Sequence, residues 1–201
     1  MTKKRIEFWF DFSSAYAYFA SLQIEELATR HNRDILWRPF MIGEAFRVTG
    51  AQRLTSTPLK GEYAVRDWQR LARLTNRSFS LPSHHPSIAL PAVRACHWLE
   101  DEMPHRLGAF ATAVFRAYFE DGIDTACVDS IAEVAHGLDI PTAGIIAANC
   151  DMRLKQAAQD RSREAVALGI FGSPWIVVDD EPFWGCDRLP SVDLWLQRGG
   201  W

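Results

Sequence analysis

Residues 6–18 read IEFWFDFSSAYAY, a run in which one structural pattern gives way to another. Apolar residues dominate 6–10 and alternate there, which is typical of a largely buried strand. The polar residues within 11–14 break the alternation and offer side chains that can cap a helix N-terminus. Apolar residues then recur at helical spacing from position 16 to about position 31. The run therefore predicts a strand that leads directly into a helix.

A second strand is predicted over residues 34–40, which read DILWRPF and end near Pro39. A strand, a helix and a strand of these lengths predict a parallel pair joined by a right-handed crossover. Strand patterns return only near the end of the chain, at residues 175–178 and 182–184, around a turn. A closing helix is expected from Asp187 to Leu196.

Between these strands the chain carries helical patterns from about Gly43 to Gly169. The order of elements predicts an α/β protein whose sheet is interrupted in sequence by helices. We expect a discontinuous domain made of residues 1–42 and 169–201, with residues 43–168 as an all-helical insertion.

The composition excludes several classes of function. Hydrophobic residues make up 48% of the 201 positions and charged residues 23%, so a packed core is expected. A net charge of −3 gives no reason to expect a nucleic-acid partner, whose phosphates require a basic face. The basic cluster at residues 3–5 leads into an apolar run that Glu7 and Asp11 interrupt, unlike the uninterrupted run of a secretory signal. No apolar run is long enough to cross a membrane, so a cytoplasmic location is expected.

The four cysteines lie far apart, without a Cys-x-x-Cys pair and without histidines at metal-ligand spacing. Neither a redox dithiol nor a metal site is predicted. We expect Cys96, Cys127 and Cys150 to be small, buried, reduced side chains. Cys186 belongs to a motif considered below.

The polar residues after the first strand are the first candidate site. A helix that starts at the carboxyl end of a strand offers free N–H groups and the positive end of its dipole, and both favour an anion. A hydroxyl of Ser13 or Ser14 can there donate to a thiolate and lower its pKa. The alternative is that these serines only cap the helix.

Two further candidate stretches flank the hairpin predicted near the end of the chain. The first is Phe-Gly-Ser-Pro-Trp at 171–175, where Pro174 either ends a turn or follows a cis bond that exposes the backbone of Ser173. The second is Phe-Trp-Gly-Cys-Asp-Arg at 183–188. Asp187 there can accept from an ammonium group of a ligand or can cap the last helix.

Together these stretches resemble the 2-hydroxychromene-2-carboxylate isomerases, relatives of the kappa-class glutathione transferases in the DsbA-like thioredoxin superfamily. The most specific similarities are Phe-Gly-x-Pro before a strand and Trp-Gly-x-Asp-Arg-Leu after a hairpin. The similarity also includes the segments 60–63 and 66–72, the Pro82…His84-His85-Pro86 loop, and Arg94. The resemblance implies a thioredoxin-like fold with a large all-helical insertion.

The resemblance also implies a glutathione site. In the family the serine that matches Ser14 hydrogen-bonds the sulfur of glutathione, which makes Ser14 the catalytic candidate. DsbA-like oxidoreductases carry their Cys-x-x-Cys where this chain has residues 14–17. The other implied glutathione contacts are Ser173 with Pro174 for the cysteinyl part, Asp187 with Cys186 for the γ-glutamyl end, and Lys60 for the glycyl carboxylate.

The implied activity is the glutathione-dependent cis–trans isomerisation of 2-hydroxychromene-2-carboxylate to trans-o-hydroxybenzylidenepyruvate, a step in aromatic hydrocarbon (naphthalene) catabolism. The thiolate would add to the substrate double bond and leave after rotation, which is nucleophilic catalysis. His84, His85 and Arg94 are candidates for the substrate carboxylate, although surface ion pairs are an alternative role for each. A cytoplasmic homodimer that acts on a small aromatic molecule is expected.

Three positions depart from the family pattern. Ala15 replaces the usual proline after the serine, Ala51 stands where an asparagine is common, and Ile88 replaces another asparagine. Because these departures leave the substrate open, two alternatives remain. One is a kappa-like glutathione transferase that conjugates small electrophiles, and the other is a family member without catalytic activity.

Overall fold

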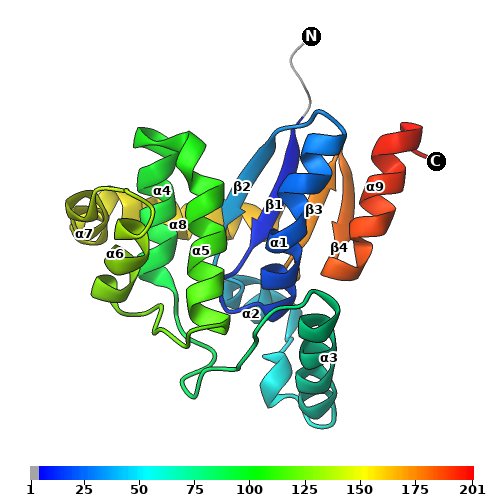
Figure 1. Cartoon of the computed structure of the whole chain (residues 1–201), viewed down its shortest axis with the longest axis horizontal. Helices are drawn as coiled ribbons and strands as arrows, with labels where there is room; N and C mark the ends of the chain where they lie inside the picture. Colours follow the sequence, from blue (N-terminus) through cyan, green and yellow to red (C-terminus); the bar gives the residue numbers. More distant parts are fainter. Residues whose placement is uncertain (1–4) are drawn as a thin grey trace.

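The computed structural model describes residues 5–201, so most of the basic cluster at residues 3–5 lies outside the described part. Its centre is a four-stranded sheet in the order β2-β1-β3-β4 (Figure 1). The strands are β1 (Ile6–Phe10), β2 (Ile35–Pro39), β3 (Trp175–Val178) and β4 (Glu181–Trp184). β1 pairs with β2 in parallel and with β3 antiparallel, and β3 and β4 form an antiparallel hairpin. The predicted parallel pair and the predicted hairpin are confirmed.

β1 is a central strand covered on both faces. Ile6, Phe8 and Phe10 belong to the main hydrophobic core. Trp9 points to the opposite face, where it joins Phe40 and other residues in a second, smaller core. This double burial explains why the strand reads as an almost continuous apolar run.

Helix α1 (Ala15–Arg30) provides the crossover from β1 to β2 and lies against one face of the sheet (Figure 1). The chain between β2 and β3 is helical and forms two groups in Figure 1: α2 and α3 near the N-terminal end of α1, and α4 to α8 beside the β2 edge. These helices are α2 (Gly43–Thr49), α3 (Lys60–Leu74), α4 (Leu90–Glu102), α5 (Leu107–Phe119), α6 (Val128–His136), α7 (Thr142–Cys150) and α8 (Met152–Ala167). Helix α9 (Leu189–Arg198) closes the chain and flanks β4.

Two expectations from the sequence need correction. The closing helix does not begin at Asp187, because residues Cys186–Arg188 form a separate 3-10 turn and α9 starts at Leu189. Of the cysteines, Cys96 is buried as expected, but Cys127 is half-buried and Cys150, the last residue of α7, is exposed. Cys150 sits at a helix end, where apolar spacing no longer forces a side chain inward.

The sheet and the α4–α6 helices share one hydrophobic core. Phe12, just after β1, packs on Phe115 of α5 with ring centroids 5.0 Å apart, and Phe10 lies 5.5 Å from the same ring. All three side chains are almost fully buried. In the part of the chain that the structure describes, no helix is long and apolar enough to cross a membrane.

The Phe115 side chain packs α5 against the sheet. Phe115→Ala should therefore lower the free energy of unfolding by about 3–5 kcal/mol, the usual cost of removing a buried aromatic side chain. Denaturant unfolding followed by near-ultraviolet circular dichroism measures this change. Leu74→Ala is the control, because its side chain is 80% exposed and the loss should stay within about 0.5 kcal/mol. Separate unfolding transitions for the sheet and the helices would contradict a shared core.

Candidate functional site

Ser14 and Ser173 meet at the carboxyl end of β1, although 159 residues separate them in the sequence. The Ser14 hydroxyl donates to the Ser173 carbonyl oxygen at 2.8 Å. The backbone N–H of Asp11 donates to the Ser173 hydroxyl oxygen at 2.9 Å. The Ser173–Pro174 peptide bond is cis, which is the alternative in which the backbone of Ser173 is exposed. These contacts fix the turn before β3 against the start of α1.

Ser14 is the N-cap of α1, and its hydroxyl oxygen accepts from the Ala17 N–H at 3.2 Å. Capping is therefore an observed role of this residue. Among residues 5–201, the backbone N–H groups of Ala15 and Tyr16 have no acceptor. Free N–H groups at the positive end of a 16-residue helix are a favourable environment for an anion.

Asp11 is a buried carboxylate beside these groups, and the sequence analysis gave it no binding role. One carboxylate oxygen accepts from the N–H and the hydroxyl of Ser13, and the other accepts from the N–H of Ile42. Burial raises the pKa of Asp11, and the hydrogen bonds from Ser13 and Ile42 oppose this rise. The signal in the sequence was a single charged residue that directly follows a buried strand. Asp11 thus holds the β1–α1 turn against the start of α2.

The residues that follow β4 lie beside the cis-proline turn as well. The Gly185 N–H donates to the Pro174 carbonyl oxygen at 3.1 Å, which sets Cys186 and Asp187 beside the cis-proline turn. Asp187 is exposed and pairs with Arg188 at 3.0 Å. The N-cap of α9 is Arg188, and no side chain caps that helix. Capping of the last helix by Asp187 is therefore not what the structure contains.

Cys186 is surrounded by acidic groups. Burial raises the pKa of the Cys186 thiol to about 12, and the nearby carboxylates of Asp187 and Asp67 add to this effect. Asp67, on α3, accepts from the Tyr16 hydroxyl at 3.0 Å and so joins α3 to the start of α1. Cys186 is therefore a protonated thiol at neutral pH and a poor nucleophile.

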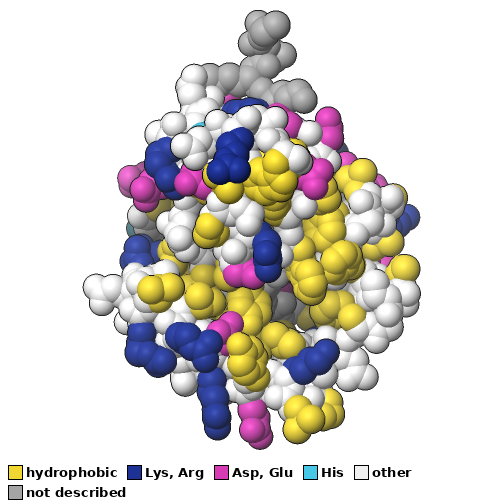
Figure 2. Space-filling view, turned by 90° about the vertical axis from the view of Figure 1, so that its right-hand side faces the viewer, with side chains coloured by type: hydrophobic (Ala, Val, Ile, Leu, Met, Phe, Trp, Pro, Cys, Tyr) yellow, Lys and Arg dark blue, Asp and Glu magenta, His cyan; other side chains and the backbone are white. Residues whose placement is uncertain are grey.

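The remaining family positions are Lys60, Ala51, Ile88 and Ala15, and among residues 5–201 no hydrogen bond or ion pair joins the first three of them to Ser14. Lys60 is exposed at the first turn of α3, about two turns or ~10 Å along the helix from Asp67. Ala51 and Ile88 are both exposed, whereas Ala15 is buried in the main core. Figure 2 views the molecule from the side of α9, β4 and α3, where hydrophobic side chains surround a hollow near the centre of the face.

The three candidates for a substrate carboxylate have different surroundings. Arg94, on α4, donates to the Asn149 carbonyl oxygen at 2.5 Å and so binds α7 instead. His84 is exposed and contacts the Ile123 carbonyl oxygen at 3.2 Å. His85 is half-buried and contacts the Tyr118 hydroxyl at 2.9 Å.

Residues 5–197 match the family described as the DSBA-like thioredoxin domain. The chain belongs to this family. It is 27% identical to a 2-hydroxychromene-2-carboxylate isomerase of Sphingobium xenophagum over 96% of this chain and 98% of that protein. It is 23% identical to glutathione S-transferase kappa 2 of Caenorhabditis elegans, over 94% of this chain and 90% of the relative.

A solved structure of 2-hydroxychromene-2-carboxylate isomerase superposes with a TM-score of 0.86 at 21% identity, over 96% of this chain and 94% of the other. The predicted thioredoxin-like α/β fold with inserted helices and the resemblance to these isomerases are therefore confirmed. In this DSBA-like domain the N-cap and first residues of α1 are Ser14-Ala-Tyr-Ala17, without a cysteine. No group of metal ligands is present among residues 5–201.

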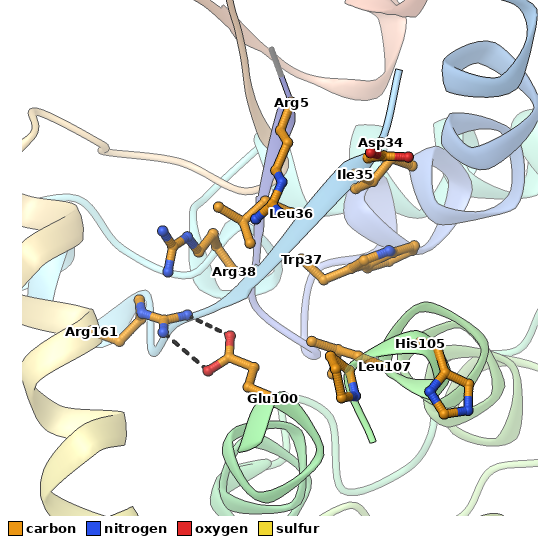
Figure 3. A pocket seen from close by; sticks show the side chains of 11 residues that line it. Arg5, Asp34, Ile35, Leu36, Trp37, Arg38, Glu100, His105, Leu107 and Arg161 are labelled. Atoms are coloured by element: carbon orange, nitrogen blue, oxygen red, sulfur yellow. Dashed lines mark hydrogen bonds and ion pairs between the residues drawn. The ribbon is translucent and has the colours of Figure 1, made fainter. Parts of the chain in front are cut away.

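This DSBA-like domain also has a cavity of about 510 Å³ away from Ser14, along the edge strand β2 (Figure 3). A bidentate ion pair between Arg161 and Glu100, at 3.0 and 3.1 Å, crosses it. This pair ties α8 to α4. None of the site residues predicted from the sequence lines the cavity.

The pKa of Asp11 gives a prediction for Asp11→Asn. Because the folded-state pKa lies above the unfolded value of about 3.9, the contribution of this carboxyl to stability is complete below that value. The contribution falls as pH rises through the folded-state pKa. The wild-type advantage over Asp11→Asn in free energy of unfolding should therefore be larger at pH 4 than at pH 7.

Denaturant titrations of both proteins at the two pH values measure this difference. Ser13→Ala serves as a control, because it removes one partner of Asp11 but retains the carboxyl, and so should retain the pH dependence. A wild-type advantage that grows from pH 4 to pH 7 would show that the folded-state pKa is lowered instead.

Proposed function

We propose that this protein is a glutathione-dependent isomerase that converts 2-hydroxychromene-2-carboxylate to trans-o-hydroxybenzylidenepyruvate. The main support is the start of α1, where the Ser14 hydroxyl and the N–H groups of Ala15 and Tyr16 are available to an anion. No cysteine is present there to supply the thiolate. Such a site suits a thiolate that comes from outside the chain. The relatives named isomerase support the reaction, and the kappa-class relative supports glutathione as the cofactor.

The residues around the site fit glutathione by their chemistry. The backbone of Ser173 before the cis bond to Pro174 suits the cysteinyl part of a bound peptide. The exposed carboxylate of Asp187 suits the γ-glutamyl ammonium, and Lys60 suits the glycyl carboxylate. Cys186 contributes a protonated thiol, which leaves glutathione as the source of the nucleophile.

When bound, glutathione supplies a thiolate that adds reversibly to the substrate double bond and permits rotation about it. The chain holds that sulfur at the start of α1. For the Ser14 hydroxyl to donate to sulfur, its single hydrogen must leave the Ser173 carbonyl oxygen. The Ala15 and Tyr16 N–H groups need no such exchange, because neither has an acceptor among residues 5–201.

A kappa-like transferase activity toward small electrophiles is the second candidate, favoured by the kappa-class relative. Incubation with glutathione and each substrate separates the two, because conjugation consumes glutathione and isomerisation regenerates it. We include in the proposal a cytoplasmic homodimer that acts in aromatic hydrocarbon catabolism.

Ser14→Ala tests the central residue. Removal of one donor to an anion should lower kcat/KM about 30- to 1,000-fold, which corresponds to ~2–4 kcal/mol. The pKa of the bound glutathione thiol, read from thiolate absorbance, should rise at the same time. Loss of the cap should lower the free energy of unfolding by about 1 kcal/mol. Ser13→Ala is the matched control, and unchanged activity of Ser14→Ala would remove Ser14 from the mechanism.

Asp187→Asn tests the γ-glutamyl contact. A hydrogen bond between a carboxylate and an ammonium contributes about 1.5–3 kcal/mol, so glutathione affinity should fall about 10- to 100-fold. Thermal stability should remain nearly constant, because Asp187 is exposed and caps no helix. Calorimetry with glutathione and a melting curve give the two values. Unchanged glutathione affinity would exclude this contact.

A further inference from the structure

His85 and Tyr118 form a side-chain pair that the proposed glutathione contacts do not use. The Tyr118 ring is fully buried on α5, and its hydroxyl lies 2.9 Å from His85 Nδ1. The Ser87 N–H donates to the same hydroxyl at 3.0 Å. The Ser87 hydroxyl in turn donates to Asp124 at 2.9 Å. The loop that carries His85 is therefore tied to α5 and to the turn that follows it.

This network favours one tautomer of the His85 ring. The Tyr118 hydroxyl already accepts from the Ser87 N–H, and its own hydrogen is free to donate to His85 Nδ1. Burial raises the pKa of Tyr118 to about 12, so this hydrogen is present at neutral pH. His85 Nδ1 is then the acceptor, and its Nε2 carries the hydrogen.

His85 is a neutral donor, not a cation. Burial lowers the pKa of His85 to about 4, and the neighbouring Arg53 and His84 lower it further. Within residues 5–201, His85 Nε2 has no hydrogen-bond partner, yet it is not among the buried polar atoms. An oriented N–H group with no protein acceptor is thus available to a ligand.

The His85 ring is connected to the start of α1 by packed aromatic side chains. Phe12, between Asp11 and Ser13, packs on Phe115, and Tyr118 follows Phe115 by one turn of α5. The Trp68 ring of α3 packs against two further rings. Its centroid lies 6.3 Å from that of His85 and 5.9 Å from that of Tyr16 on α1. The His85 ring therefore lies between the start of α1, α3 and the end of α5.

A positive group lies near the neutral His85 ring. The Arg53 guanidinium, on the exposed segment before α3, lies within electrostatic range of both the Asp11 carboxyl and the His85 ring. In the described part of the chain Arg53 has no ion-pair partner within 4.0 Å. The Arg53 guanidinium and the His85 N–H together suit an acidic group of a ligand.

We propose that His85 donates Nε2–H to the carboxylate of an aromatic 2-oxo acid, or of its cyclic hemiketal form, while Arg53 neutralises the charge. The inference rests on the proposed function, since it places this carboxylate beside the glutathione sulfur. Tyr118 is a positioning residue, which acts by fixing the ring and the tautomer of His85.

The binding test uses two unreactive ligands that differ only in the carboxylate: 4-phenyl-2-oxobutanoate and 4-phenylbutan-2-one. Calorimetry with the glutathione-loaded wild-type protein should show tighter binding of the oxo acid. His85→Phe should weaken oxo-acid binding about 10- to 100-fold, as expected for a hydrogen bond to a charged group, and leave ketone binding unchanged. The control is His136→Phe, an exposed histidine at the end of α6.

Three results would overturn the proposal: equal oxo-acid affinity in the wild type and His85→Phe, an equal loss for both ligands, or no oxo-acid binding to the wild type. Glutathione affinity, measured on the same proteins, keeps the two proposals apart. If glutathione does not bind, the proposed function fails, and the oxo acid titrated into the glutathione-free protein still tests His85.

A spectroscopic measurement tests the tautomer without any ligand or variant. Nitrogen-15 correlation spectra of the wild-type imidazoles at pH 7 should show His85 as the neutral Nε2–H form. In Tyr118→Phe the Nδ1 acceptor loses its donor, so the signal should move toward a mixture of tautomers, and oxo-acid affinity should fall by a few fold. A wild-type Nδ1–H form would overturn the assignment.

Discussion

The hydrogen bond from the Ser14 hydroxyl to the Ser173 carbonyl oxygen, together with the reciprocal bond from the Asp11 N–H, holds the candidate site together. Each bond spans about 160 residues of sequence, so the site exists only when β1 and β3 are paired. The residues after β4 are placed relative to this contact by one further bond. The Gly185 N–H reaches the Pro174 carbonyl oxygen because the β3–β4 hairpin returns the chain to the same edge. This return of the chain brings the turn that contains Asp187 into contact with α1.

The parallel pair and the hairpin followed from the sequence because their patterns are local. Residues 6–10 alternate, a helix of crossover length follows, and the rules of connection then allow one arrangement. Asp187 was harder to judge. Spacing alone could not separate a ligand contact from a helix cap, because the 3-10 turn at Cys186–Arg188 depends on how the hairpin ends. The role of a residue between two elements depends on tertiary structure.

The groups that the sequence analysis missed have side chains that act across long separations. Asp11 reaches Ile42 of the next loop, and Tyr118 reaches His85 through a bond between residues 33 positions apart. The spacing of apolar residues in the sequence cannot predict these contacts, because the partners lie on elements that only the tertiary structure brings together. For the same reason Arg94 could not be separated from His85 by sequence alone: both are polar residues near the Pro82–Pro86 loop, but α4 turns Arg94 toward α7.

The site combines two kinds of donor that respond differently to a change of ligand charge. The hydroxyl of Ser14 is already used by a carbonyl oxygen, so its bond to a thiolate replaces an existing one and gains only the difference between the two. Among residues 5–201, the Ala15 and Tyr16 N–H groups and the Nε2–H of His85 have no acceptor, so a ligand that pairs with them replaces water and breaks no bond within the protein. A neutral histidine is suited to this position. A charged one would repel Arg53, whereas the neutral ring can donate to a carboxylate that Arg53 attracts. The same burial that lowers the pKa of His85 therefore lets a hydrogen-bond donor lie within electrostatic range of the Arg53 cation without repelling it.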